Sequence, residues 1–306
     1  ALKASLSLLE IGPKKIMYPL LASIYLAPLC EPLRQAGIEP SLLSYIWGPS
    51  GTKKSTLIAL LLCHFGSFDP KGLPASFRDT ANSIEKLAFL AKDTILPVDD
   101  LFPAKEPKER IKQDGVLEHL SRGQGDRTAR GRMKADTSLR EGLPPRGLAL
   151  CSGESMPLSG SSLARTFIYK LQKGSIDLEK LTQAQSQQDL LSHAMRGYLE
   201  YLAPQMEDLP GQEKEAFIHL RGRALKDAAI KTRHSRLDEA ISHLHLGLNA
   251  FLKFTVSQGI LTQEEGEKIL QEAWEIFNQL ADEQALQEQA GEPSKKIAEA
   301  SLELEA

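Results

Sequence analysis

Cysteine is scarce in this chain, which argues against a disulfide scaffold or a cysteine-based metal site. Its 306 residues include three cysteines, Cys30, Cys63 and Cys151, which lie far apart without metal-type spacing. We therefore expect isolated buried thiols in a reducing, cytoplasmic compartment. His243 and His245 are two residues apart, and a helix would not place them on one face as metal ligands.

Long apolar runs and strong net charge are lacking as well. The most apolar stretch, residues 16–29, contains two prolines and is shorter than the ~18 residues of a membrane span, so we predict no membrane segment. It also lacks the start of a signal peptide. The formal net charge is −3, so a nucleic-acid site must be a local basic patch. The chain begins at Ala1 without a methionine, as a fragment of a longer protein would.

The composition is typical of a globular protein, with 42% hydrophobic and 25% charged residues. Residues 1–38 have helical apolar periodicity, and so do residues 176–306, whose acidic end looks frayed. Between them, residues 39–175 alternate short apolar runs with helical patterns, which predicts an α/β core with a mainly parallel sheet sandwiched by helices. The strands are expected at 42–47, 94–98, 147–152 and 165–169, with a shorter one at 76–78.

The strongest motif follows the first expected strand and precedes a helix. It reads Gly48-Pro49-Ser50-Gly51-Thr52-Lys53-Lys54-Ser55-Thr56. This fits the P-loop pattern G-x-x-x-x-G-K-[ST], in which backbone N–H groups and a helix N-terminus cradle the phosphates of ATP. Lys54 would contact the β- and γ-phosphates, and Ser55 would ligate Mg²⁺.

One position departs from that pattern, because Lys53 stands where the second glycine is usual. That glycine lets the loop approach the phosphates without a side chain. A lysine there must point outward or contact phosphate itself, so we expect nucleotide binding to survive and hydrolysis to be less certain. The alternative is a Gly/Ser turn before a helix that carries a lysine by chance.

A second motif, Ile95-Leu96-Pro97-Val98-Asp99-Asp100, resembles a Walker B strand. Asp99 would hold Mg²⁺ through water and Asp100 would polarise the attacking water, although a glutamate is commoner at the second place. We expect Lys54 to face Asp99, on strands that are neighbours in the sheet. Pro97 argues against a central position for this strand.

Polar residues at the ends of two further strands complete the predicted catalytic set. Ser152 ends the third strand and would align the water near the γ-phosphate, with Glu154 as a secondary candidate. Arg165 opens the fourth strand and would contact the nucleotide of a neighbouring subunit, with Arg146 as its competitor. A strand-ending serine and an exposed arginine without a catalytic role are the alternatives.

Basic residues gather in two places. The first is a glycine-rich segment that we expect to be a mobile loop following a DNA backbone, with the candidates Arg122, Arg127, Arg130, Arg132 and Lys134. A solvated loop is the alternative. The second cluster lies in the C-terminal helices and could equally line a subunit interface: Arg221, Arg223, Lys226, Lys231, Arg233 and Arg236.

Four ordered blocks, GPSGTKKST, LPVDD, HLSRGQGDRTARGR and LALCSGES, resemble P-loop ATPase domains of primase–helicase-like proteins of phages, plasmids and mobile elements. Gly123-Gln124-Gly125 and Ser152-Gly153-Glu154 match segments typical of that family. The resemblance spans about residues 10–170. It implies an AAA+-like core, a hexameric ring and movement on DNA during replication of the element.

These observations predict an ATP-driven DNA helicase or translocase that uses ATP and Mg²⁺, acts on single-stranded DNA and assembles as a homo-oligomer. Two other functions stay open. The chain could be an ATPase that remodels or assembles proteins without contacting DNA, or a nucleotide-binding structural module with little hydrolysis.

Overall fold

The computed structural model describes residues 1–129, 131, 133, 137–138, 141–156 and 160–303, of which 160–161 and 290–303 are described by their backbone alone. Four strands form one parallel sheet: β1 (Leu43–Trp47), β2 (Ile95–Leu101), β3 (Leu148–Gly153) and β4 (Thr166–Lys170). The predicted parallel sheet is therefore confirmed, and the four longer predicted strands each begin one residue before an observed strand. The short strand expected at 76–78 was wrong, because only Ser76 pairs there, in an isolated bridge to Asp99.

The strand order is β2-β3-β1-β4. The expectation that the strands before the P-loop and before the aspartates are neighbours was wrong, because β3 lies between them. All four strands are parallel, so their carboxyl ends still meet along one edge of the sheet. Pro97 is accommodated because β2 ends the row, with only an isolated bridge from Ser76 to Asp99 on its outer side.

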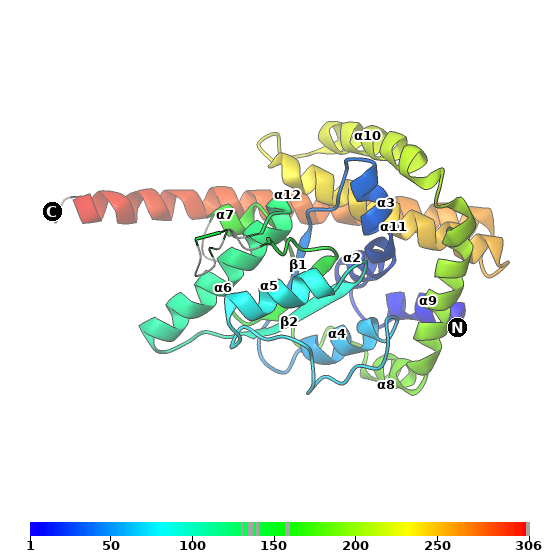
Figure 1. Ribbon diagram of the computed structural model, residues 1–306, viewed down its shortest axis with the longest axis horizontal. Coiled ribbons are helices and arrows are strands. Elements are labelled where there is room, and N and C mark those ends of the chain that lie inside the picture. The colour runs from blue at the N-terminus through cyan, green and yellow to red at the C-terminus, as the bar shows by residue number, and fades with distance from the viewer. Residues whose placement is uncertain (130, 132, 134–136, 139–140, 157–159, 304–306) are drawn as a thin grey trace.

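The two faces of the sheet bury alternate residues in two separate apolar clusters. Tyr45, Val98 and Cys151 point into one cluster, which α5 (Ala81–Leu90) and α6 (Pro107–Asp126) cover. Ile46, Leu150 and Tyr169 point to the other, which α4 (Lys54–Leu62) and helices from both ends of the chain cover. This period of two is what a sheet buried on both faces requires, and Figure 1 shows helices on both sides.

Helices from the two ends of the chain pack against each other over this second face. The N-terminal ones are α1 (Leu2–Ser7), α2 (Lys14–Leu26) and α3 (Cys30–Gln35), with 3₁₀ turns at Leu8–Glu10 and Ala27–Leu29. The C-terminal ones are α8 (Leu178–Ser186), α9 (Asp189–Leu202), α10 (Leu209–Asp227), α11 (Ser235–Ser257) and α12 (Gln263–Glu303), with a 3₁₀ turn at Ala203–Gln205. One apolar cluster contains residues from all three predicted segments, 1–38, 39–175 and 176–306. The division at 38 and 175 stays a prediction.

The helical stretch Lys14–Gln35 is long and apolar enough to cross a membrane by length and composition, but 89% of its apolar window is buried inside the protein. Its burial against α11 identifies it as a core helix of this fold. The three cysteines are free and buried, as predicted.

The long helix α12 runs along the molecule and extends beyond it (Figure 1). Its Gln284 lies against β4, the strand at the end of the row. The Gln284 side chain accepts a hydrogen bond from the Ile168 backbone N–H (3.2 Å) and donates one to the Thr166 carbonyl (2.8 Å). A side-chain amide thus satisfies backbone groups on the outer edge of β4.

Candidate functional site

The loop between β1 and α4 is fixed by close contacts of its backbone. A Cβ on Gly48 would lie 2.3 Å from the Leu171 carbonyl oxygen, so only glycine fits there. The Thr52 hydroxyl donates a hydrogen bond of 2.9 Å to the Pro49 carbonyl and closes the turn. These contacts set the loop at the carboxyl edge of the sheet, directly before the N-terminus of α4.

Lys53, the residue that departs from the P-loop pattern, has φ +69°, the left-handed conformation that favours glycine. Its side chain is exposed. The structure therefore explains why a glycine is usual here, and it places the lysine side chain outward.

Lys54 lies inside the curve of this loop. Its ammonium donates hydrogen bonds to the Gly48 carbonyl (2.7 Å) and the Pro49 carbonyl (3.0 Å). Burial lowers the pKa of Lys54, although nearby carboxylates, Glu154 first among them, act in the opposite direction. A partly buried positive charge is well placed to attract an anion.

The two predicted motifs meet in one cavity of about 290 Å³. Its lining comprises the loop and the ends of β2 and β3: Ser50, Gly51, Thr52, Lys53, Lys54, Ser55, Thr56, Asp99, Asp100, Ser152, Gly153 and Glu154. The sequence-predicted residues of the loop, the aspartate pair and the third strand are thus brought together.

A β-bulge in β2 separates the two aspartates in orientation. Val98 pairs with Cys151 and Leu101 with Gly153, so two residues of β2 stand opposite the single Ser152. The Ser152 hydroxyl donates a hydrogen bond to Asp99, which is partly buried. Asp99 and Asp100 are adjacent in β2, but their side chains therefore have different surroundings.

Asp100, the second aspartate, is exposed and has φ +69°. Such strained backbone is often found at functional sites. Its carboxylate accepts a hydrogen bond of 3.1 Å from the Arg78 guanidinium. No sequence pattern singles out Arg78, because it lies 22 residues from Asp100.

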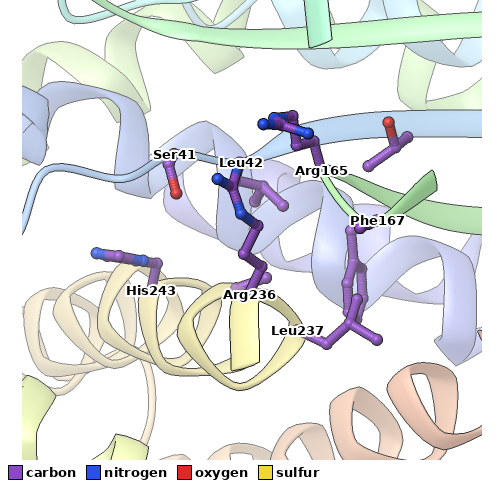
Figure 2. A pocket seen from close by; sticks show the side chains of 10 residues that line it. Ser41, Leu42, Arg165, Phe167, Arg236, Leu237 and His243 are labelled. Atoms are coloured by element: carbon purple, nitrogen blue, oxygen red, sulfur yellow. The ribbon is translucent and has the colours of Figure 1, made fainter. Parts of the chain in front are cut away.

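At the opposite, amino-terminal edge of the sheet, two arginines converge on one acid. Arg165 lies 3.2 Å and Arg236 2.9 Å from carboxylate oxygens of Asp126. Burial opposes ionisation of Asp126, but hydrogen bonds from Arg236 and Arg165 hold its pKa below the usual value. Figure 2 shows Arg236 of α11 and Arg165 in a small cavity that Ser41, Leu42 and His243 also line. Sequence reasoning had placed Arg236 only within a general basic cluster.

Arg146, the competitor of Arg165, is bound within the protein. Its Nε donates a hydrogen bond of 2.6 Å to the Phe89 carbonyl, and its guanidinium lies 3.9 Å from the centre of the Phe89 ring. Both candidate arginines are thus engaged within the protein, Arg146 by Phe89 and Arg165 by Asp126, and the choice between them stays a prediction.

The expected glycine-rich loop was wrong for residues 122–126, which form the last turns of α6. Because α6 continues the amphipathic pattern of 105–120, Gln124 is buried there. Arg122 is exposed and pairs with Glu118 at 2.7 Å. The Arg127 side chain is only 10% exposed. Arg130, Arg132 and Lys134 lie outside the described residues.

Among the described residues, no group of three or more His, Cys, Asp or Glu side chains forms a metal cluster. Ser55 and Asp99 both line the cavity of about 290 Å³. A site of this kind suits Mg²⁺, which commonly takes one or two protein ligands together with phosphate oxygens and water.

Comparison with known proteins supports the fold at low sequence identity. No known protein family and no curated protein matches this sequence. Among solved structures, the active helicase Cch of SCCmec type IV matches with a TM-score of 0.59 and 13% identity over 96% of this chain. The chain spans about half of that helicase, 54% of its length. A structure of JCV helicase matches with 12% identity over 87% of this chain and 61% of that one, at a TM-score of only 0.29. The chain therefore has a fold similar to that of a solved helicase.

Proposed function

We propose that this chain binds MgATP in the cavity between residues 48–56 and the aspartate pair, and hydrolyses it to drive a DNA helicase or translocase. The observation that carries the proposal is the lining of that cavity, which combines a P-loop, two aspartates and a strand-ending serine. Backbone N–H groups of the loop and the ammonium of Lys54 suit phosphate oxygens.

In this proposal each residue has a separate task. Ser55 and Asp99 hold Mg²⁺, which would neutralise charge on the phosphates when bound. The Ser152 hydroxyl orients the Asp99 carboxylate. Asp100, exposed and turned away by the bulge, accepts the proton of the attacking water.

The arginine of the site comes from a neighbouring copy of the chain. Arg165 precedes β4 and Lys54 follows β1, so the length of a parallel strand lies between them, about 16 Å at ~3.3 Å per residue. Arg165 therefore lies at the wrong edge to reach the nucleotide of its own chain. A ring, expected to be hexameric, would bring the two edges together.

The DNA-binding part of the proposal relies on the basic residues Arg122, Arg130, Arg132 and Lys134. Arg122 is exposed at the end of α6. Arg127 is left out because its guanidinium is buried. The similarity to a solved helicase supports a nucleic acid as the partner, and we propose single-stranded DNA because the four residues are basic. A cytoplasmic replication protein of a phage, plasmid or mobile element fits these features.

The test measures ATP hydrolysis with and without single-stranded DNA, for the wild type and Lys54→Ala. We expect DNA-stimulated turnover in the wild type and none in Lys54→Ala, with Lys71→Ala, a change on an exposed loop, as the matched control. DNA affinity should fall steeply as salt rises, since phosphate contacts release counterions.

Two outcomes would favour the other functions. Turnover without any response to DNA indicates an ATPase acting on proteins. ATP binding with no turnover in either form indicates a structural nucleotide module.

A further inference from the structure

A second, larger cavity of about 420 Å³ lies where the amino ends of β1, β2 and β3 meet, on the edge opposite the nucleotide cavity. It is lined by Cys30, Glu31, Arg34, Glu39, Lys92, Arg127, Pro144, Pro145 and Arg146. None of these residues lines the nucleotide cavity. Its volume is within the range of small-molecule sites.

Arg127 is the unusual member of this lining. Its Nη1 donates a hydrogen bond of 2.7 Å to the Gly147 carbonyl, and Nε lies 3.7 Å from a Glu39 oxygen, too far for a hydrogen bond. Within the described part of the chain, Nε and Nη2 have no hydrogen-bond partner, and both are shielded from solvent. The Arg127 side chain is nine-tenths buried, and two of its nitrogens lack hydrogen-bond partners, which destabilises the folded state unless a ligand supplies acceptors.

The other charges of the cavity leave it positive. Four cations (Arg34, Lys92, Arg127, Arg146) and two carboxylates (Glu31, Glu39) line it, which gives 4 − 2 = +2. Asp93, just outside the lining, lies 3.7 Å from Lys92 and lowers this excess to about +1. Burial raises the pKa of Glu39 and that of Asp93, which opposes the negative charge of both carboxylates.

We infer that this cavity binds a phosphate group, with the buried Arg127 charge beneath it and Arg34 and Lys92 at its rim. Arginine suits this ligand because its planar fork matches phosphate oxygens, and a buried charge attracts an anion more strongly than an exposed one. The phosphate could come from a free phosphate or mononucleotide, or from the end of a DNA strand.

The experiment uses the full chain with Lys54→Ala, so that the P-loop does not compete for phosphate. Binding of inorganic phosphate is measured by calorimetry at low salt, with and without Arg127→Met. We expect at least tenfold weaker binding after Arg127→Met, because a charge-assisted hydrogen-bond donor is removed. The matched control is Arg110→Met, an exposed arginine on α6, the helix that ends directly before Arg127; it should leave the affinity unchanged.

Equal phosphate affinity with and without Arg127→Met would overturn the inference, as would no binding at millimolar phosphate in Lys54→Ala itself. If circular dichroism shows that Arg127→Met does not fold, the exposed pair Arg34→Gln and Lys92→Gln replaces it. That double change should weaken binding severalfold, and unchanged affinity would again overturn the site.

Two further ligands separate the sources of the phosphate. Thymidine 5′-monophosphate binding as tightly as a 5′-phosphorylated oligonucleotide identifies a small-molecule site. Tighter binding of the oligonucleotide, lost when its 5′-phosphate is removed, identifies a site for a DNA end. Both outcomes retain the phosphate site and assign its source.

Discussion

The two edges of the central sheet differ in how their charged residues are assembled. At the carboxyl edge, Lys54 and the aspartate pair follow directly from the ends of β1 and β2. At the amino edge, Arg165 and Arg236 converge on Asp126 from segments 39 and 110 residues away. The first edge is built from local motifs and the second from long-range packing. In the proposed function, the carboxyl edge holds the nucleotide and the amino edge supplies an arginine to the neighbouring copy.

The largest effect on turnover should come from replacing an arginine at the amino edge of the sheet. Arg165→Ala should lower kcat for ATP about 10³-fold or more without changing ATP affinity, because a trans-acting arginine stabilises charge in the transition state. Mixing Arg165→Ala with Lys54→Ala should restore part of the activity, since each copy supplies what the other lacks. The measurement is steady-state turnover of the mixture against the separate variants. No recovery would place the arginine outside the neighbouring site.

Next in size is the carboxyl edge. Asp100→Asn should lower kcat about 10²-fold while ATP binding persists, because the amide cannot accept the proton of the attacking water. Single-turnover hydrolysis and ATP binding are measured side by side, with Asp114→Asn, a half-exposed residue of α6, as control. A loss of ATP affinity equal to the loss of turnover would contradict a role limited to the chemical step.

A smaller effect should come from the ion pair at that edge. Arg78→Ala should raise turnover by up to about fivefold at low salt, since an exposed pair is worth at most ~1 kcal/mol and its loss frees Asp100. Raising the salt should remove the difference between variant and wild type, because salt screens the pair. A rate that falls after Arg78→Ala would mean that the arginine supports the carboxylate.

The smallest effect on activity should come from restoring the usual P-loop glycine. Lys53→Gly should leave ATP affinity within about twofold and should not slow hydrolysis, because the Lys53 side chain already points outward. It should raise the free energy of unfolding by about 1 kcal/mol, since glycine adopts the left-handed conformation without strain. Urea unfolding and ATP titration measure the two effects. A collapse of ATP binding would show that the loop is not the phosphate site.

Much of this fold could be predicted from local patterns. Strands such as β1 and β3 are short apolar runs with a glycine at or directly after their end. The helix α5 begins at Ala81, directly after Thr80, whose hydroxyl caps it. Strand order was not predictable in the same way. Nothing in residues 42–47 or 94–101 indicates that β3 inserts between them, because that choice depends on how the intervening helices pack.

In the candidate site, too, the features set by local sequence could be predicted, and those set by long-range packing could not. The loop and the aspartates were found because each is a contiguous pattern with a known chemical use. The bulge that turns Asp100 away from Asp99, the pairing with Arg78 and the burial of Arg127 arise from contacts between distant segments. The glycines at 123 and 125 suggested a loop, but packing against the sheet overrode their low helix propensity.

The Gln284 side chain has a consequence for how copies of this chain can associate. By occupying backbone groups of Thr166 and Ile168, it blocks a strand of another molecule from adding to β4. Assembly at this side must therefore proceed through side chains and helices, because the β4 strands of two copies cannot pair with each other. Removing α12 would uncover that strand and turn it into a site for sheet-to-sheet aggregation.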